Sequence, residues 1–154
     1  MKVVERSALV PYSAQQMYEL VNDVDRYPQF LPWCTAAHVE PAAPGEVMAS
    51  ISVARGLLRT EFTTRNVLRP GVEITMRLVR GPFRRLLGHW RFEPQADRGS
   101  RVSFRVDFEF KSVLTSTALG PIFEALCGTI VDAFVVRARR VYSAAPLPPL
   151  ADRC

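Results

Sequence analysis

Residues 101–110, which read RVSFRVDFEF, alternate strictly between polar and apolar side chains. Such alternation is typical of an antiparallel strand with one buried face and one solvated face. The buried face of this predicted strand consists of Val102, Phe104, Val106, Phe108 and Phe110. A face this apolar must pack against other segments, so the neighbouring sequence has to supply the rest of a core.

The segment that follows, from Ser112 onward, changes to helical spacing and predicts a long amphipathic helix. The pair Gly120-Pro121 is expected to kink or restart this helix. Residues 144–154 are rich in proline and predict a disordered tail, so the folded domain is expected to comprise residues 1–143. The apolar stripe of the helix is formed by Leu119, Phe123, Leu126, Ile130, Phe134 and Val141.

The sequence before residue 101 contains further segments with a period of two. Between the first of these and the others, Ser13 and Gln16 form the pattern of a capping box that starts a helix. Asp25 is expected to begin a second, shorter helix, which Pro32 stops. Strands are predicted at residues 3–10, 35–40, 47–53, 58–64, 72–78 and 86–92.

The predicted order of elements is therefore strand, helix, helix, six strands and one long helix. Six consecutive strands form a meander, and the first strand must pair at its edge. We expect an α+β fold in which a curved antiparallel sheet of about seven strands closes around the C-terminal helix. A curved sheet over one helix is hard to fill with side chains, so an apolar cavity that binds an apolar ligand is expected between them.

The composition suits one globular domain, because the chain has 154 residues and 48% of them are hydrophobic. No uncharged apolar run reaches the length of a membrane span, and no signal peptide pattern is present. The cysteines Cys34, Cys127 and Cys154 are too few and too far apart for a disulfide framework. These features predict a cytoplasmic protein.

Charge is distributed unevenly. Residues 1–50 hold three basic and six acidic side chains, whereas residues 51–111 hold thirteen basic and six acidic ones. A basic face favours a polyanionic partner such as nucleic acid, the ribosome or an anionic membrane, and the alternative is a face that is simply solvated. The arginines expected on the outer sheet face are Arg55, Arg59, Arg65, Arg77, Arg91, Arg101 and Arg105.

Four separated blocks resemble, in the same order, the family of coenzyme Q-binding proteins and ribosome association toxins RatA. They are RSALVPYSAQQMYELVNDVDRYPQFLPWC at 6–34, FTTRN at 62–66, GPFRRLLGHWRFEP at 81–94 and ALGPIFEALCGTIVDAFVVRARRVY at 118–142. That family belongs to the START-like, polyketide cyclase-like superfamily. The resemblance therefore implies its helix-grip fold, in which a curved sheet surrounds a long C-terminal helix.

The resemblance implies two different functions. Some relatives bind ubiquinone and support respiratory electron transfer. The enterobacterial relative is described as a toxin that binds the large ribosomal subunit and blocks subunit association. Our first hypothesis is a non-catalytic carrier of ubiquinone or a related polyprenyl quinone, which contacts respiratory complexes or the inner face of the membrane peripherally. The alternative is a RatA-type toxin, and a third hypothesis is an aromatase or cyclase.

Candidate ligand-binding residues follow from the predicted cavity. The segment 27–34 is dense in aromatic side chains and prolines, and it forms either the mouth of a tunnel for an isoprenoid tail or a plug over the open end of the sheet. The predicted mouth residues are Tyr27, Phe30, Leu31 and Trp33. The predicted interior residues are Trp90, Phe92, Phe104, Phe108, Phe123, Leu126 and Ile130.

A candidate interaction surface consists of Phe83, Arg84 and Arg85, which follow the Gly81-Pro82 turn. An exposed aromatic ring between arginines could contact membrane headgroups or ribosomal RNA. The alternative is that Phe83 folds back onto the core.

Catalysis has little support in the sequence. The two histidines, His38 and His89, lie on different predicted strands and belong to no metal-binding pattern. No paired carboxylates, nucleophile elbow or glycine-rich phosphate loop is present. We therefore expect no metal, no required cofactor and no catalytic residues, with ubiquinone as a bound ligand.

Overall fold

The computed structural model describes residues 2–96 and 99–143, and the predicted order of elements is confirmed. The predicted disorder of residues 144–154 lies outside the described residues. In chain order, the elements are β1 (Lys2–Val10), α1 (Ala14–Asn22), the 3₁₀ helix η1 (Val24–Gln29), β2 (Cys34–Pro41), β3 (Glu46–Arg55), β4 (Leu58–Arg69), β5 (Glu73–Arg80), β6 (Phe83–Pro94), β7 (Ser100–Phe110) and α2 (Val113–Ser143).

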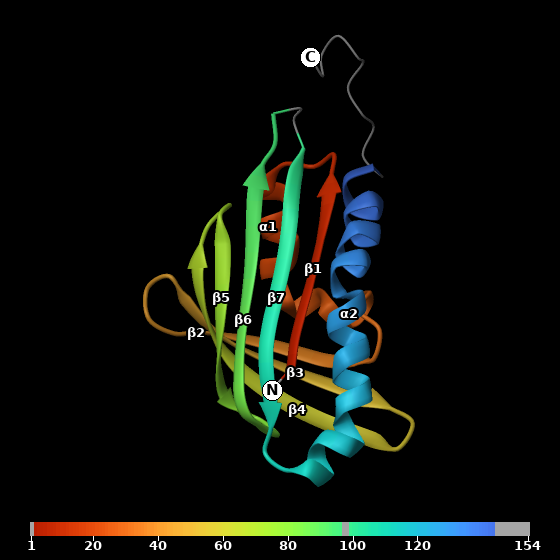
Figure 1. Ribbon diagram of the computed structural model, residues 1–154. Coiled ribbons are helices and arrows are strands. Elements are labelled where there is room, and N and C mark those ends of the chain that lie inside the picture. Colours follow the sequence, from red (N-terminus) through yellow and green to blue (C-terminus); the bar gives the residue numbers. More distant parts are fainter. Residues whose placement is uncertain (1, 97–98, 144–154) are drawn as a thin grey trace.

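The seven strands form one antiparallel sheet in the order β1-β7-β6-β5-β4-β3-β2. Strands β2 to β7 are a meander, and β1 pairs with β7 at its edge, with Lys2 opposite Phe108 and Val10 opposite Ser100. Figure 1 shows β3 and β4 crossing the direction of β6 and β7 steeply, while α2 lies along the open side of the curved sheet. The expected curved sheet around a C-terminal helix is confirmed.

Helix α1 begins with the predicted capping box. The Ser13 hydroxyl accepts a hydrogen bond of 3.0 Å from the Gln16 amide, and the Ser13 amide donates one of 2.9 Å to the Gln16 side chain. The second predicted helix begins and ends about two residues earlier than expected and has 3₁₀ geometry, over Val24–Gln29. The hydroxyl of Tyr27 donates to the carbonyl of Val21, which ties this short turn to the end of α1.

Helix α2 runs as one continuous element through Pro121, so of the two expected outcomes there, a kink or a restart, the restart is wrong. Its first turn is capped by Ser112, whose hydroxyl accepts a 3.0 Å hydrogen bond from the Thr115 amide. Its length and hydropathy would also suit a membrane span. Its apolar composition has a simpler cause, because buried side chains such as Phe123 and Phe134 pack against the sheet.

Strand β6 begins earlier than predicted, at Phe83, and the proposal of Phe83 as an exposed contact residue is wrong. Phe83 is only 2% exposed, and its ring centroid lies 4.8 Å from those of Phe110 and Phe123. A register shift between Phe83 and Arg85 lets both Phe83 and Leu86 face inward although they are three residues apart. The alternative orientation, in which Phe83 folds onto the core, is therefore the one observed.

Candidate functional site

A small cavity lies between the concave face of the sheet and α2. Its volume is about 60 Å³, and its walls come from η1, the inner faces of β2 to β7, and α2. Seven of the predicted ligand-binding residues line it, although ligand binding itself stays a prediction. These seven are Tyr27, Leu31, Trp90, Phe104, Phe123, Leu126 and Ile130.

The other four predicted ligand-binding residues do not line the cavity. Phe92 is buried on the far side of Trp90, where its ring meets that of Tyr18 at 5.8 Å. Phe108 instead belongs to an aromatic cluster, with its ring 4.7 Å from that of Phe123. Both side chains occupy the predicted sheet face, but the cavity extends over only part of that face.

Phe30 and Trp33 lie outside the cavity for a different reason. Each is only half-buried, and each ring is covered by a guanidinium group. The Arg137 carbon lies 5.0 Å from the Phe30 ring centre, and the Arg55 carbon lies 5.3 Å from that of Trp33. Of the segment 27–34, Tyr27 and Leu31 plug the cavity, while Phe30 packs against Phe134 outside it and Trp33 lies beneath Arg55.

The cavity is closed in the form described. Ligand pockets for drug-sized molecules typically measure about 300 Å³ or more. A volume of about 60 Å³ is room for a few water molecules, not for a quinone ring with an isoprenoid tail. Binding such a ligand would require α2 or η1 to move away from the sheet.

Two polar side chains of β4, Thr64 and Asn66, lie inside this apolar cavity, and the sequence reasoning missed them. The Thr64 hydroxyl donates a 2.7 Å hydrogen bond to the carboxamide oxygen of Asn66. The Asn66 NH₂ group has no hydrogen-bond acceptor among the described residues. Every fully buried side-chain nitrogen or oxygen atom among these residues does have a partner, so the NH₂ group must border open space. We conclude that this NH₂ group faces the cavity space. The signal was present, because Phe62, Thr64 and Asn66 alternate along one strand face.

The cavity also holds two thiols, Cys34 and Cys127, and neither is poised as a nucleophile. Burial raises the pKa of Cys34 to about 11. Burial, with a contribution from the Glu124 charge, also raises the pKa of Cys127. Protonated thiols are poor nucleophiles. Among residues 2–96 and 99–143, no group of histidine, cysteine and carboxylate side chains could hold a metal ion.

The outer face of the sheet carries a separate hollow of about 550 Å³ over β1, β7 and β6, which we call the arginine hollow. Arg91 lies opposite Ser103, and Arg101 and Arg105 flank Ser103 along β7. Arg105 is paired with Glu5 and lies 3.6 Å from Asp107. Within the described chain, Arg91 and Arg101 form no ion pair, so their positive charge is available to a partner.

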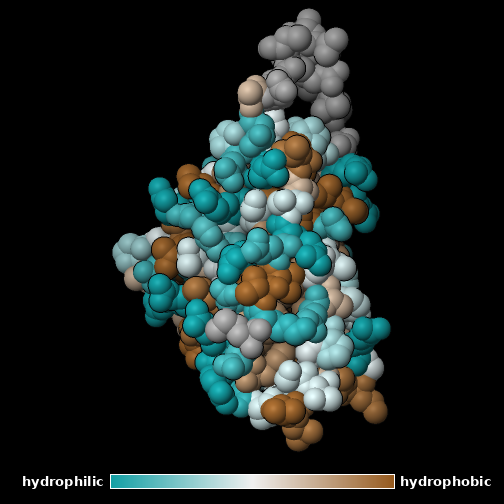
Figure 2. All heavy atoms as spheres, viewed as in Figure 1, coloured by the Kyte–Doolittle hydropathy of each residue, from teal (hydrophilic) through white to brown (hydrophobic). Residues whose placement is uncertain are grey.

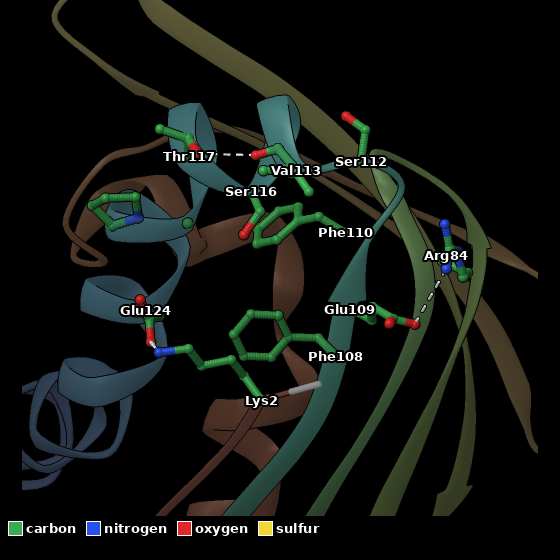
Figure 3. Close-up of a pocket in the computed structure, with 12 residues that line it drawn as sticks. Lys2, Arg84, Phe108, Glu109, Phe110, Ser112, Val113, Ser116, Thr117 and Glu124 are labelled. Atoms are coloured by element: carbon green, nitrogen blue, oxygen red, sulfur yellow. Dashed lines mark hydrogen bonds and ion pairs between the residues drawn. The ribbon is translucent and has the colours of Figure 1, made fainter.

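The two remaining residues of the predicted interaction surface, Arg84 and Arg85, are both exposed. Arg84 donates a 3.2 Å hydrogen bond to the Lys111 carbonyl and lies 4.0 Å from Glu109. Figure 3 shows Arg84 at the rim of another hollow, of about 460 Å³, beside the start of α2. On its opposite side Lys2 and Glu124 form a 2.7 Å ion pair.

A seven-stranded antiparallel sheet that wraps a long C-terminal helix and encloses an apolar cavity defines the helix-grip class of proteins. The chain belongs to the polyketide cyclase/dehydrase and lipid transport family, whose model matches residues 10–135. The predicted membership in the group of RatA and coenzyme Q-binding proteins is confirmed by sequence relatives of both kinds.

The ribosome association toxin RatA of Escherichia coli is 47% identical over 144 residues, which cover 94% of this chain and 91% of the relative. The mitochondrial coenzyme Q-binding protein COQ10 of Drosophila melanogaster is 30% identical over 139 residues, which cover 88% of this chain and 57% of the relative. The crystal structure of the Zhui aromatase/cyclase from a Streptomyces species matches with a TM-score of 0.81 at 19% identity. That match covers 95% of this chain and 99% of the other, and it establishes a common fold only.

Proposed function

We propose that this protein associates with the ribosome and that the outer face of its sheet is the docking surface. The proposal rests on the 47% identity to a ribosome association toxin over nearly the whole chain. The observation that connects this relationship to a surface is the arginine hollow, where Arg91 and Arg101 lie beside Ser103 and form no ion pair with any described residue.

The chemistry of the hollow suits the phosphates of folded RNA. Guanidinium groups bind phosphate through two parallel hydrogen bonds, and hydroxyl groups add further donors. Contacts of this kind depend strongly on salt, because each phosphate that is neutralised releases counterions. The binding partner that the family resemblance implies is the large subunit, and the expected consequence is interference with subunit joining.

The test is co-sedimentation of the purified protein with isolated large and small ribosomal subunits over a series of salt concentrations. We expect binding to the large subunit that weakens steeply as salt rises. Replacing both Arg91 and Arg101 with glutamate should lower the affinity at least about tenfold, because two phosphate contacts are lost and two repulsions appear. Subunit reassociation, followed by sucrose gradient sedimentation, should be inhibited by the unmodified protein and not by this variant.

The matched control is the double substitution Arg139→Glu and Arg140→Glu, which changes the net charge equally on the exposed side of α2. This control should bind the large subunit almost as well as the unmodified protein. Equal loss of binding in both variants would mean that net charge alone drives binding. The absence of co-sedimentation at low salt would refute the proposal.

A second candidate function is the carriage of an apolar ligand, with ubiquinone as the proposed molecule and peripheral contact with the membrane as its consequence. The specific observation in its favour is the Asn66 NH₂ group, a donor that faces an otherwise apolar cavity and would suit a quinone carbonyl. The sequence relationship to COQ10 supports the same ligand. Mass spectrometry of an organic extract of the natively purified protein tests this candidate, and an empty protein from quinone-replete cells would count against it.

A further inference from the structure

One end of the molecule carries a group of aliphatic side chains that are fully or largely exposed to solvent. Leu57, at the tip of the β3–β4 hairpin, is 100% exposed, and Val113 and Leu114, in the first turn of α2, are 84% and 79% exposed. Figure 2 shows apolar side chains protruding at this lower end, from the hairpin and from the start of α2, as placed in Figure 1. We call this region the apolar end.

The two parts of the apolar end are joined by an apolar seam. Leu58 and Pro82 on the sheet side meet Leu119 and Ile122 of α2 around a narrow hollow. The inner wall of this hollow is Phe123, whose ring also lines the cavity. Phe123 is therefore the residue that the apolar seam and the cavity share.

Cations surround the apolar end. Arg55 and Arg59 flank the hairpin tip, and Arg84 and Lys111 lie beside the start of α2. The only carboxylate paired with any of these four in the described residues is Glu109, at 4.0 Å from Arg84. Aliphatic side chains within a ring of arginine and lysine are typical of surfaces that enter the headgroup region of an anionic bilayer.

We propose that the apolar end docks on an anionic phospholipid membrane, with Leu57, Val113 and Leu114 inserted below the headgroups. The four cations are placed to contact lipid phosphates at the same depth. Trp33 lies next to the β3–β4 hairpin, because the Ala54 amide donates a hydrogen bond to the Trp33 carbonyl and the Arg55 guanidinium group covers the Trp33 ring. Tryptophan is a residue type enriched at the membrane–water interface. This docking surface is distinct from the arginine hollow and does not depend on ribosome association.

A bilayer fits this surface better than a protein groove does. The apolar side chains form two separate protrusions, at a hairpin tip and at a helix start, rather than one continuous stripe. Burying one leucine side chain contributes enough free energy to change partitioning about tenfold or more, and each nearby cation changes it roughly fivefold at an anionic surface. The two protrusions together are sufficient for reversible attachment.

The first experiment is sedimentation with large vesicles of phosphatidylcholine, with and without phosphatidylglycerol. We expect binding to the vesicles that contain phosphatidylglycerol and little binding to phosphatidylcholine alone. The substitutions Leu57→Asp and Val113→Asp should each lower vesicle binding about tenfold. Both positions are fully or largely exposed, so these variants should keep the unfolding midpoint of the unmodified protein. The control variant with Arg91→Glu and Arg101→Glu should keep most vesicle binding.

The second experiment uses Trp33 as a reporter, with vesicles whose acyl chains carry bromine, a quencher of tryptophan fluorescence. Bound protein should lose Trp33 emission, and the Trp33→Phe variant, whose remaining Trp90 is buried, should show little quenching. Unchanged binding by Leu57→Asp and Val113→Asp would overturn the proposal. A change in the oligomeric mass of these variants would also overturn it, because the apolar end would then be a contact with a second copy of the chain. A loss of ribosome binding in these variants, with no vesicle binding by the unmodified protein, would overturn it as well.

Discussion

The hydroxyl of Thr64 and the carboxamide oxygen of Asn66 are joined by a 2.7 Å hydrogen bond inside a cavity whose other walls are almost entirely apolar. Both side chains are buried, at about 5% exposure. An apolar cavity that only needed filling would favour aliphatic residues at these positions. The polar pair instead provides one oriented hydrogen-bond donor, the Asn66 NH₂ group, for a ligand that enters the cavity.

The first prediction concerns Asn66. Asn66→Leu should lower the affinity for a quinone analogue about tenfold while leaving that for a hydrocarbon ligand nearly unchanged, because only the quinone needs the NH₂ donor. Thr64→Val should reduce the free energy of unfolding by about 1 kcal/mol, since one hydrogen bond is lost. Ligand titrations and urea unfolding measure the two effects. Equal changes for both ligands would show that Asn66 does not contact the head group.

The second prediction concerns Phe123, which lies between the apolar seam and the cavity. Its ring is 4.8 Å from that of Phe83 and 4.7 Å from that of Phe108. Phe123→Ala should reduce the free energy of unfolding by about 3–5 kcal/mol, because it leaves a large void in the core. In the fraction that stays folded, the seam and the cavity should merge and bind an apolar fluorescent dye more tightly.

The control for this prediction is Phe30→Ala, which removes a ring that is only half-buried. Urea unfolding should show a clearly smaller reduction in the free energy of unfolding for Phe30→Ala than for Phe123→Ala. A loss as large as that of Phe123→Ala would indicate that the core depends on the outer ring as much as on the inner one.

The third prediction uses the buried thiols as a probe of cavity opening. Because burial raises the pKa values of Cys34 and Cys127, both should react slowly with a thiol reagent at pH 8. The measurement requires the Cys154→Ser variant, so that Cys154 does not contribute. A bound ligand that holds the cavity open should change the labelling rate of both thiols together. Rapid labelling of the free protein would mean that the closed form is short-lived.

The fourth prediction concerns pH. Glu73 accepts a 2.6 Å hydrogen bond from His89 and a 2.7 Å one from Arg69, and these hold its pKa below the ordinary value of 4.5. A lowered folded-state pKa stabilises the protein above about pH 4.5, and this contribution disappears as pH falls through the folded-state pKa. Glu73→Gln should therefore lower stability at pH 7, by no more than about 1 kcal/mol, and have little effect near pH 3. Urea unfolding at several pH values measures the difference.

Much of the fold follows from local sequence patterns. The strict alternation in β7 needs no tertiary information, and the Ser13–Gln16 capping box is a contact between near neighbours. The long apolar stripe of α2 likewise predicts a helix that the sheet must cover. Even the pairing of β1 with the free edge of the meander follows once the number and order of strands are known.

The error at Phe83 has a clear physical cause, because a β-bulge shifts the two-residue period without marking the sequence. Phe83 and Leu86 face the same side only because the register shifts between them. A shift of the same kind lies between β4 and β5, where the consecutive residues Thr63 and Thr64 pair with Arg80 and Leu78. The size of the cavity was also beyond prediction, since it depends on how side chains from η1, six strands and α2 interlock.

The edge pairing of β1 also constrains the synthesis of the protein. Strand β1, Lys2–Val10, pairs with Ser100–Phe110 of β7, which is translated about a hundred residues later. Loop closure over such a separation carries a large entropic penalty and slows folding. Until β7 has emerged, both β1 and the open edge of β6 expose unpaired backbone groups that could pair with other chains. The nascent chain therefore passes through a long interval of vulnerability to aggregation, which ends only when nearly the whole domain has been made.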